Sequence, residues 1–203
     1  MLVWSIKAAL SADSIDQVYV STDSREIAEV AKLHGADVIE RPAGISGDMA
    51  SSETALLHAL EVLAEDGHQP EVLIFLQCTS PLTLAEDIDG AVALMNTEGA
   101  DSAFTACRFV EFLWRTDETG AAGGINHDMK GRQRRQDRAA EYLETGAVYV
   151  MQTSGFLEHK HRFFGRTVIY EVPKERSLQI DDPGDLVVTG AMMSSGMHRP
   201  GKN

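Results

Sequence analysis

Short apolar runs alternate with amphipathic stretches along most of the 203-residue chain. An apolar run of roughly four to eight residues bounded by turn formers is typical of a strand, and apolar positions recurring every third or fourth residue are typical of a helix. Strands alternating with helices predict an α/β fold with a parallel sheet. The predicted strands cover residues 17–21, 37–40, 72–76, 101–106, 146–151 and 167–172, and the predicted helices cover residues 1–10, 22–34, 53–66, 83–98 and 185–193.

The run Val72–Leu76 ends abruptly in polar residues and a proline, in the order V-L-I-F-L-Q-C-T-S-P-L. A short run without polar side chains indicates a strand buried on both faces, as an interior parallel strand is. Its polar end then lies at the carboxyl edge of the sheet, where α/β proteins bind ligands. Gln77, Thr79 and Ser80 are therefore candidates for contact with a substrate; alternatively, they only form the turn from strand to helix.

A loop rich in glycine and serine covers residues 41–52 and ends where the next helix begins. The amino terminus of a helix offers free N–H groups that suit an anionic or polar ligand. Ser51 or Ser52 can cap this helix or can donate a hydrogen bond to a ligand, and both interpretations stay open.

Both helical and strand periodicity break down over residues 108–144. This segment contains two aromatic clusters, the flexible stretch Ala121–Gly124 and the basic run Lys130–Arg138. An aperiodic stretch of this length inside a compact domain is typical of a functional loop or an arm. The predicted organisation is one α/β domain formed by residues 1–107 and 146–203, with an inserted arm formed by residues 108–145.

The formal net charge of −13 argues against a general nucleic-acid binder, because affinity for the phosphate backbone needs clustered Lys and Arg. The two cysteines, Cys78 and Cys107, lack the spacing of a metal site or a disulfide framework. Free thiols indicate a reducing compartment, so we expect a soluble cytoplasmic protein. Residues 1–10 lack the basic leading region of a signal peptide and are far shorter than the ~20 apolar residues of a membrane span.

Seven segments follow one another along nearly the whole chain: V-Y-V-S-T-D-S-R-E-I-A (18–28), E-R-P-A-G-I-S-G-D-M-A-S-S (40–52), F-L-Q-C-T-S-P-L (75–82), R-R-Q-D (134–137), G-A-V-Y-V-M (146–151), R-F-F-G (162–165) and E-R-S-L-Q-I-D (175–181). In this order they resemble the acylneuraminate cytidylyltransferase family. That family comprises the CMP-sialic acid synthetases and their relatives acting on legionaminic or pseudaminic acid. One such match would be weak evidence, whereas seven in order with plausible spacing are strong evidence.

The resemblance implies a three-layer, Rossmann-like α/β fold of the nucleotide-diphospho-sugar transferase type, with a mostly parallel sheet and a dimerisation arm. The family opens with a strand and a phosphate-binding loop of the type R-x-G-S-K-G, and this sequence starts after them. We therefore expect the first strand and the phosphate loop to be absent, which would leave unpaired backbone groups and an uncovered apolar slot. Either the natural product begins upstream of Met1, or the chain is a defective or repurposed relative.

The resemblance also implies that Arg41, Ala50 and Ser52 hold the cytosine of CTP. A planar guanidinium, an exposed backbone and a hydroxyl suit the acceptor edge of a pyrimidine.

A nine-carbon sugar acid is the implied second substrate. An arginine suits its carboxylate because guanidinium groups bind carboxylates in bidentate fashion. Phe163 and Phe164 correspond to an aromatic pair near the acyl substituent of the sugar, or alternatively they belong to the core. The candidate sugar-binding residues, including the serine at the end of the central run, are Gln77, Ser80, Arg135, Tyr149, Phe163 and Phe164.

The implied reaction is attack of the anomeric hydroxyl on the α-phosphorus of CTP, with release of pyrophosphate. The candidate catalytic residues are Gln77, Arg135 and Asp181, and Asp181 is the expected ligand of a Mg²⁺ cofactor. The family usually shows Asp-Ile-Asp here, but the first position is Gln179. With one carboxylate missing, we expect weaker metal binding or ligation through water.

The arm is expected to reach over a partner subunit, so the resemblance implies a homodimer that completes each site in trans. A second function is a catalytically silent relative that dimerises and binds nucleotide or sugar weakly. A CMP-Kdo synthetase fits less well, because Gln77–Pro81 differs from the acidic motif of those relatives. A general hexose nucleotidyltransferase fits the downstream motifs poorly.

Overall fold

The computed structural model describes residues 1–47, 49–131 and 133–196. Arg132 of the basic run and residues 197–203 of the predicted α/β domain lie outside this description. The helices are α1 (Leu2–Leu10), α2 (Arg25–Leu33), α3 (Ser52–Glu65), α4 (Ala85–Thr97), α5 (Thr153–His159) and α6 (Pro183–Ser195). The strands are β1 (Tyr19–Thr22), β2 (Asp37–Glu40), β3 (Val72–Leu76), β4 (Ser102–Phe109), β5 (Trp114–Thr116), β6 (Ala122–Gly124), β7 (Glu141–Gln152) and β8 (Thr167–Glu171). Short 3-10 helices are η1 (Ala43–Ile45), η2 (Arg135–Asp137) and η3 (Lys174–Arg176). Within the described ranges, no helix combines the length and apolar character that crossing a bilayer requires.

Most elements lie where the apolar pattern predicts them, and β2 and β3 have the predicted bounds. The pattern missed α5 and the short strands β5 and β6. The helix α5 has 7 residues, too few for a helical period to repeat clearly. The strand β7 begins five residues before the predicted strand, inside the segment expected to form the arm.

The main sheet is built around β7. Its strand order is β3-β7-β4-β8, in which β7 is antiparallel to both neighbours and β8 is parallel to β4. The strands β1 and β2 form a separate parallel pair. The predicted α/β class is confirmed, but the main sheet is mixed rather than mostly parallel. The chain leaves the sheet along β4, passes through the arm and returns along β7, and such a direct return makes adjacent strands antiparallel.

The strand β3 is an edge strand, which corrects the expectation of an interior parallel strand. The Gln77 N–H, just past its end, donates to the Ala147 carbonyl at 3.2 Å. Backbone groups alternate sides along a strand, so those of Ile74 and Leu76 point to the opposite edge, where no described strand pairs. An apolar run indicates burial on both faces, but it does not determine the number or direction of the partner strands.

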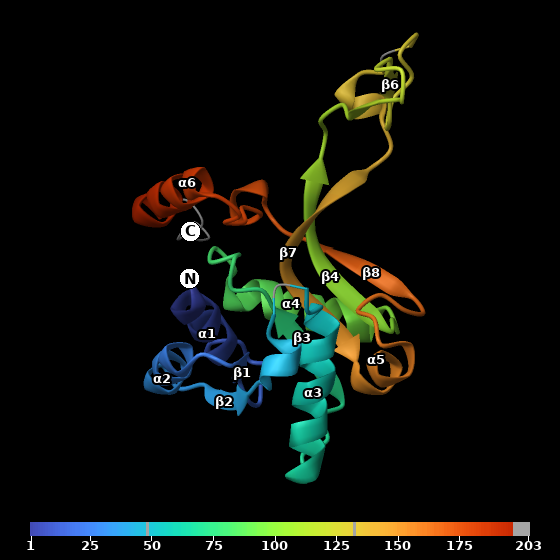
Figure 1. Cartoon of the computed structure of the whole chain (residues 1–203). Helices are drawn as coiled ribbons and strands as arrows, with labels where there is room; N and C mark the ends of the chain where they lie inside the picture. The colour runs from blue at the N-terminus through green and yellow to red at the C-terminus, as the bar shows by residue number, and fades with distance from the viewer. Residues whose placement is uncertain (48, 132, 197–203) are drawn as a thin grey trace.

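The helix α1 packs against both sheets (Figure 1). Ile6 lies in a small core with Ala31 of α2 and side chains of β1 and β2. Ala8, and Ala12 just after the end of the helix, pack instead in the cluster that contains β3, β7 and α4. No hydrogen bond joins the two sheets in the described part of the chain, so this helix holds them together by apolar contact.

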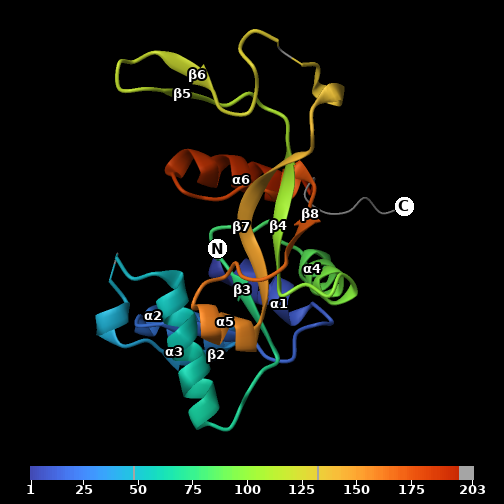
Figure 2. The same ribbon diagram turned by 90° about the vertical axis from the view of Figure 1, so that its right-hand side faces the viewer.

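Helices cover both faces of the main sheet, which gives the predicted three layers (Figure 2). Successive side chains of a strand point to opposite faces. Val148 and Val150 of β7 accordingly pack with α4 and α1, while Tyr149 and Met151 pack with α3 and α5. The position of a residue along β7 therefore determines whether its side chain faces α4 and α1 or faces α3 and α5.

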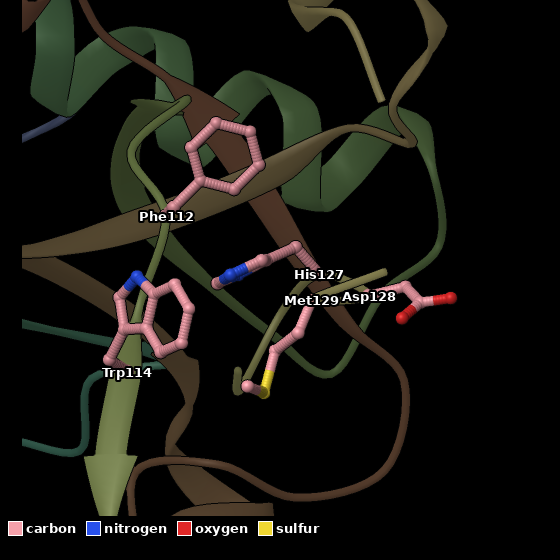
Figure 3. Close-up of a pocket in the computed structure, with 5 residues that line it drawn as sticks. All are labelled: Phe112, Trp114, His127, Asp128 and Met129. Carbon is pink, nitrogen blue, oxygen red and sulfur yellow. The ribbon is translucent and has the colours of Figure 1, made fainter. Parts of the chain in front are cut away.

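Between β4 and β7 the chain extends away from the sheet as an arm (Figures 1 and 2). Its base is fastened by Arg138, whose guanidinium donates to the Val110 carbonyl at 2.8 Å and lies 4.5 Å from the Phe112 ring centroid. The His127 ring contacts Phe112 and Trp114 edge-on, with centroids 4.8 and 4.7 Å apart. These side chains line a hollow of about 200 Å³ on the arm, shown in Figure 3. The role of residues 108–145 as a dimerisation arm stays a prediction.

A buried carboxylate fixes the C-terminal part of the chain to α4. Asp87 is 2% exposed and accepts hydrogen bonds from Arg176 Nε at 3.0 Å and Nη2 at 2.7 Å, and from the Leu84 N–H at 3.0 Å. Two parallel bonds from one guanidinium make a strong and directional pair. The segment that follows η3, which carries Gln179 and Asp181, is thereby held near α4.

Replacing Asp87 by Ala is expected to lower the free energy of unfolding by about 3–5 kcal/mol, because the buried Arg176 would keep only its ion pair with the half-exposed Glu86. Urea unfolding followed by circular dichroism measures the change. Glu29→Ala is the control, since Glu29 pairs with Arg25 on the surface with 67% of its side chain exposed; its expected effect is about 0.5 kcal/mol or less. Equal small changes in both variants would show that the buried pair does not anchor the segment.

Candidate functional site

Two glutamine side chains converge over Gly146, at the point where β3 ends. Gly146 has φ +63°, and a Cβ there would lie 2.8 Å from Gln77 Oε1 and 2.6 Å from Gln179 Oε1. This backbone conformation is costly for residues with a Cβ, and the glutamines fill the space that a side chain would need. Glycine therefore allows residues from β3, β7 and the C-terminal segment to meet at one point.

An irregularity in the pairing of β4 with β7 shapes the backbone next to Gly146. Phe104 pairs with Tyr149 but Ala106 pairs with Glu144, so residues 145–148 of β7 bulge opposite the single residue Thr105 of β4. The Thr105 and Thr145 hydroxyls are buried and lie 2.7 Å apart, and Thr105 Oγ1 accepts the Val148 N–H at 3.2 Å. A bulge bends its strand and re-aims side chains, and here the threonines satisfy the freed backbone groups.

The segment after η3 crosses the end of β3. The Ile180 N–H donates to the Thr79 carbonyl at 2.9 Å, so the turn after β3 holds this segment in place. The Asp182 and Asp185 carboxylates accept backbone N–H groups at the start of α6 and form its capping box. In the described chain, the neighbouring Asp181 carboxylate has no hydrogen-bond or ion-pair partner, so its oxygens are open to a ligand.

The described residues contain no group of three or more His, Cys, Asp or Glu side chains arranged to hold a metal ion. Mg²⁺ in nucleotide sites usually takes one or two carboxylates together with phosphate oxygens and waters. The open Asp181 carboxylate fits that pattern as a single protein ligand. The uncharged Gln179 amide, turned toward Gly146, adds no second charge.

Aromatic rings form a wall on the face of the sheet covered by α3. Tyr149 stacks with Phe75 at a centroid distance of 5.7 Å, and Phe163 meets Tyr149 edge-on at 6.0 Å. Phe164 lies behind them, 9% exposed and stacked on His159 at 5.3 Å. The core alternative therefore describes Phe164, and Tyr149 is itself only 3% exposed, whereas Phe75 and Phe163 are the partly buried rings of the wall.

A charged group lies against this wall. The Arg162 guanidinium is 4.5 Å from the Tyr149 ring centroid and 5.2 Å from that of Phe75. Its Nε donates to Glu53 Oε1 at 2.7 Å, and the two side chains are only 14% and 16% exposed. The Tyr149 hydroxyl donates to the Glu144 carboxylate.

These contacts shift the ionisation of the groups. Burial alone would raise the pKa of Glu53, but the hydrogen bond from Arg162 brings it below its usual value. Burial would lower the pKa of Arg162, and the bond to Glu53 raises it instead. Burial, followed by the bond to Glu144, raises the pKa of Tyr149 to about 12. The wall therefore keeps an ion pair charged and a phenol neutral at ordinary pH.

The candidate nucleotide residues lie on the loop between β2 and α3. The Arg41 guanidinium donates to the Ser21 carbonyl at 2.5 Å and to Ser21 Oγ at 3.1 Å, which fixes its position and leaves other N–H groups of the guanidinium for a base. Ser51 caps α3, and Ser52 is its first residue. Capping is thus the observed role of Ser51, while Ser52 and the exposed Ala50 stay candidates.

Two candidates do not join the cluster in a single chain. Ser80 is 1% exposed and its hydroxyl donates to the Thr145 carbonyl at 3.4 Å, so in this conformation it serves the turn. The short helix η2, which begins at Arg135, lies out on the arm, away from the end of β3 (Figure 2). Their sugar-binding roles stay predictions.

Residues 1–179 match the family model described as "Cytidylyltransferase". The chain belongs to the cytidylyltransferase family. It is 32% identical over 184 residues to the "N-acylneuraminate cytidylyltransferase A" of Danio rerio, covering 89% of this chain and 42% of that protein. It is 30% identical over 190 residues to the "N-acylneuraminate cytidylyltransferase" of Escherichia coli O18:K1:H7 (strain RS218 / NMEC), covering 91% and 44%. The predicted family is confirmed, and the chain spans less than half the length of these relatives.

Solved structures support the fold of this cytidylyltransferase-family chain. It is similar to CMP:2-keto-3-deoxy-manno-octonic acid synthetase complexed with CTP, with a TM-score of 0.65 and 15% identity over 95% of this chain and 87% of that one. It is also similar to 4-diphosphocytidyl-2C-methyl-D-erythritol synthase from Anaerococcus prevotii DSM 20548, with a TM-score of 0.67 and 11% identity over 95% and 89%. At these identities the similarity shows the fold alone.

Sequence reasoning did not single out Glu53, Glu144 or Arg162. Arg162 is the first residue of the R-F-F-G segment, in which only the two phenylalanines were predicted to bind the sugar. Glu53 directly follows the loop serines, but its partner is 109 residues away, and no local pattern connects them. The sequence contains one indication of their importance: Glu53 and Arg162 are charged residues directly adjacent to the candidate ligand-binding residues Ser52 and Phe163.

Replacing Gly146 by Ala is expected to destabilise the cytidylyltransferase fold by about 1–2 kcal/mol from backbone conformation alone. The new methyl group would also displace Gln77 and Gln179, so ligand binding should fall. Chemical unfolding and calorimetric titration with CTP measure the two effects. Gly190→Ala in α6 is the control, since it has open space around it and gains helix propensity. Equal stability of both variants would contradict the crowding at Gly146.

Tyr149 should be the last of the 4 tyrosines to ionise, near pH 12. Its folded pKa lies above the unfolded value of about 10. Its contribution to stability is therefore complete below pH 10 and is lost as the pH rises from 10 to 12. Absorbance at 295 nm, compared between the wild type and Tyr149→Phe, isolates this titration. A difference curve centred at pH 10 would contradict the buried, bonded phenol.

Proposed function

We propose that this chain is a cytidylyltransferase that joins CMP from CTP to a sialic-type nonulosonic acid with release of pyrophosphate. Its membership of the cytidylyltransferase family supports a CTP substrate. The names of the N-acylneuraminate relatives support a nine-carbon sugar acid as the acceptor.

The meeting of Gln77 and Gln179 over Gly146, beside the Tyr149 wall, is the observation that carries this proposal. It combines amide groups for hydroxyl and carboxylate oxygens with the partly buried ring of Phe163, which rests on the buried Tyr149 and against which a sugar can pack. On the same face, Ser52 begins the helix that follows the nucleotide loop. A cytosine held by Arg41, Ala50 and Ser52 would thus approach a sugar acid held by Gln77, Tyr149 and Phe163.

In the reaction, the anomeric hydroxyl oxygen bonds to the α-phosphorus while the bond to the β-phosphate oxygen breaks. Pyrophosphate carries away the electron pair, and solvent takes the hydroxyl proton. Gln77 would orient the acceptor, and Arg135 would offset charge on the acid or the phosphates. Asp181 would hold Mg²⁺, which when bound supplies positive charge to the phosphate oxygens.

The arm, residues 108–145, would bring Arg135 to the site of a second subunit. This arrangement would account for the distance of η2 from Gln77 within one chain. The proposed assembly is therefore a homodimer of α/β domains, each site completed in trans. We further place the protein in the cytoplasm, since Cys78 and Cys107 are free thiols.

One observation favours a second function, binding without turnover. Segment 179–185 offers a single open carboxylate, because Asp182 and Asp185 cap α6 and residue 179 is a glutamine. A relative that binds nucleotide or sugar weakly and dimerises would need no metal. It would form dimers and release no pyrophosphate.

Pyrophosphate release should require both CTP and the acid, with N-acetylneuraminate as the first acid tested. Asp181→Asn is expected to lower turnover at least 100-fold and to raise the Mg²⁺ concentration for half-maximal rate, because the charged ligand is lost. Gln77→Ala should cost roughly 3–10-fold, the value of one neutral hydrogen bond.

Asp16→Asn is the matched control for Asp181→Asn, because Asp16 is exposed and lies before β1. Absence of pyrophosphate with every nonulosonic acid tried, combined with dimer formation, would favour the second function. Full activity of Asp181→Asn would remove Asp181 from the metal site.

A further inference from the structure

Arg162 makes three different contacts with three parts of the fold. It lies between α5 and β8; its Nε donates to Glu53 in the first turn of α3, and its guanidinium lies over the rings of Phe75 on β3 and Tyr149 on β7. Glu53 directly follows Ser52 at the end of the nucleotide loop. Arg162 is therefore the side chain that joins this loop to the aromatic wall.

The chemistry of these contacts requires an arginine. A guanidinium can pair with a carboxylate along its edge while its face lies on an aromatic ring, and a lysine ammonium cannot do both. Tyr149 is fixed at its other end by the bond of its hydroxyl to Glu144. The ring is thus held between Glu144 and Arg162, with Phe163 against its edge.

Stability alone is a weak reason for this arrangement. The paired side chains are only 14% and 16% exposed, and desolvating two charges offsets much of their attraction. Apolar side chains of similar size could pack between α3 and the wall at no such cost. An arginine that contacts Tyr149 and also Glu53, the neighbour of Ser52, is better explained by what it does to the ligands.

We infer that Arg162 is a positioning residue that couples the two substrate sites, by holding Tyr149 on the sugar side and, through Glu53, the start of α3 on the nucleotide side. This inference rests on the proposed function, which identifies the two ligands. CTP binding should order the loop and α3, and Arg162 then presses Tyr149 into place for the acid. Each ligand therefore strengthens the binding of the other by the same factor.

Calorimetry of CTP and N-acetylneuraminate, each alone and with the other present, measures this coupling in the full chain. The wild type should show at least a fivefold mutual increase in affinity. Arg162→Met should reduce that factor to about one and weaken binding of the acid. Arg162→Lys should keep part of the factor, since the charge pair survives without the ring contact.

Arg166→Met is the matched control. Arg166 pairs with Glu98 in the same region, but that pair is 59% and 45% exposed and touches neither ligand surface. It should leave both affinities and their coupling unchanged. Unfolding of each variant is measured in parallel, and if Arg162→Met does not fold, the Lys variant and Glu53→Gln give the same comparison.

Titration of Tyr149 at 295 nm, referenced to the Tyr149→Phe background, tests the positioning without any ligand. If Arg162 holds the ring, Arg162→Met frees it and the pKa of Tyr149 falls from about 12 toward 10. If Arg162 acts only as a nearby positive charge, its removal raises that pKa, because the guanidinium favours the phenolate and so lowers the pKa of Tyr149. The first result supports the inference and the second overturns it.

The outcomes separate this inference from the proposed function. If the wild type binds neither ligand, the proposed function fails, and the Tyr149 titration still decides the positioning. If the wild type binds both ligands and Arg162→Met loses stability while keeping the coupling factor, Arg162 is structural and the inference is overturned.

Discussion

The pairing of β7 with β3 on one side and β4 on the other is the constraint on which the rest of the structure depends. It places Gly146 next to the end of β3, sets the face on which Tyr149 lies, and carries the chain back from the arm. The shift in register at Thr105 is possible because two buried threonines satisfy the backbone there. Without that bulge, β7 would present different side chains to α3.

Two ion pairs with low exposure fasten separate segments to this sheet. Arg176 with Asp87 secures the segment that passes over β3, and Arg162 with Glu53 secures the start of α3. Both pairs connect residues distant in the sequence, and both leave charged groups largely out of water. Directional bonds of this kind define positions more sharply than apolar contact, which tolerates small displacements.

The sequence allowed the strands and helices to be located, but not their arrangement. The apolar run Val72–Leu76 predicts a strand because every side chain is apolar, yet apolar character says nothing about direction, and β3 is a partly buried edge strand, antiparallel to β7. Gln77 was predicted because polar residues that follow a strand can contact ligands, and Tyr149 because the family resemblance implies it. Glu53 and Arg162 were not predicted as site residues, because their pairing depends on the tertiary fold. Phe163 and Phe164 are adjacent, and only packing could assign one to the wall and the other to the core.

The hollow in the arm has an optical consequence. The chain contains 2 tryptophans; Trp4 lies on α1, beside the sheets, whereas Trp114 lies on the arm against the imidazole of His127. Emission from the two indoles therefore reports on separate parts of the molecule. With Trp4 replaced by phenylalanine, the fluorescence of Trp114 alone would report on changes at the arm and would not respond to changes in the α/β domain.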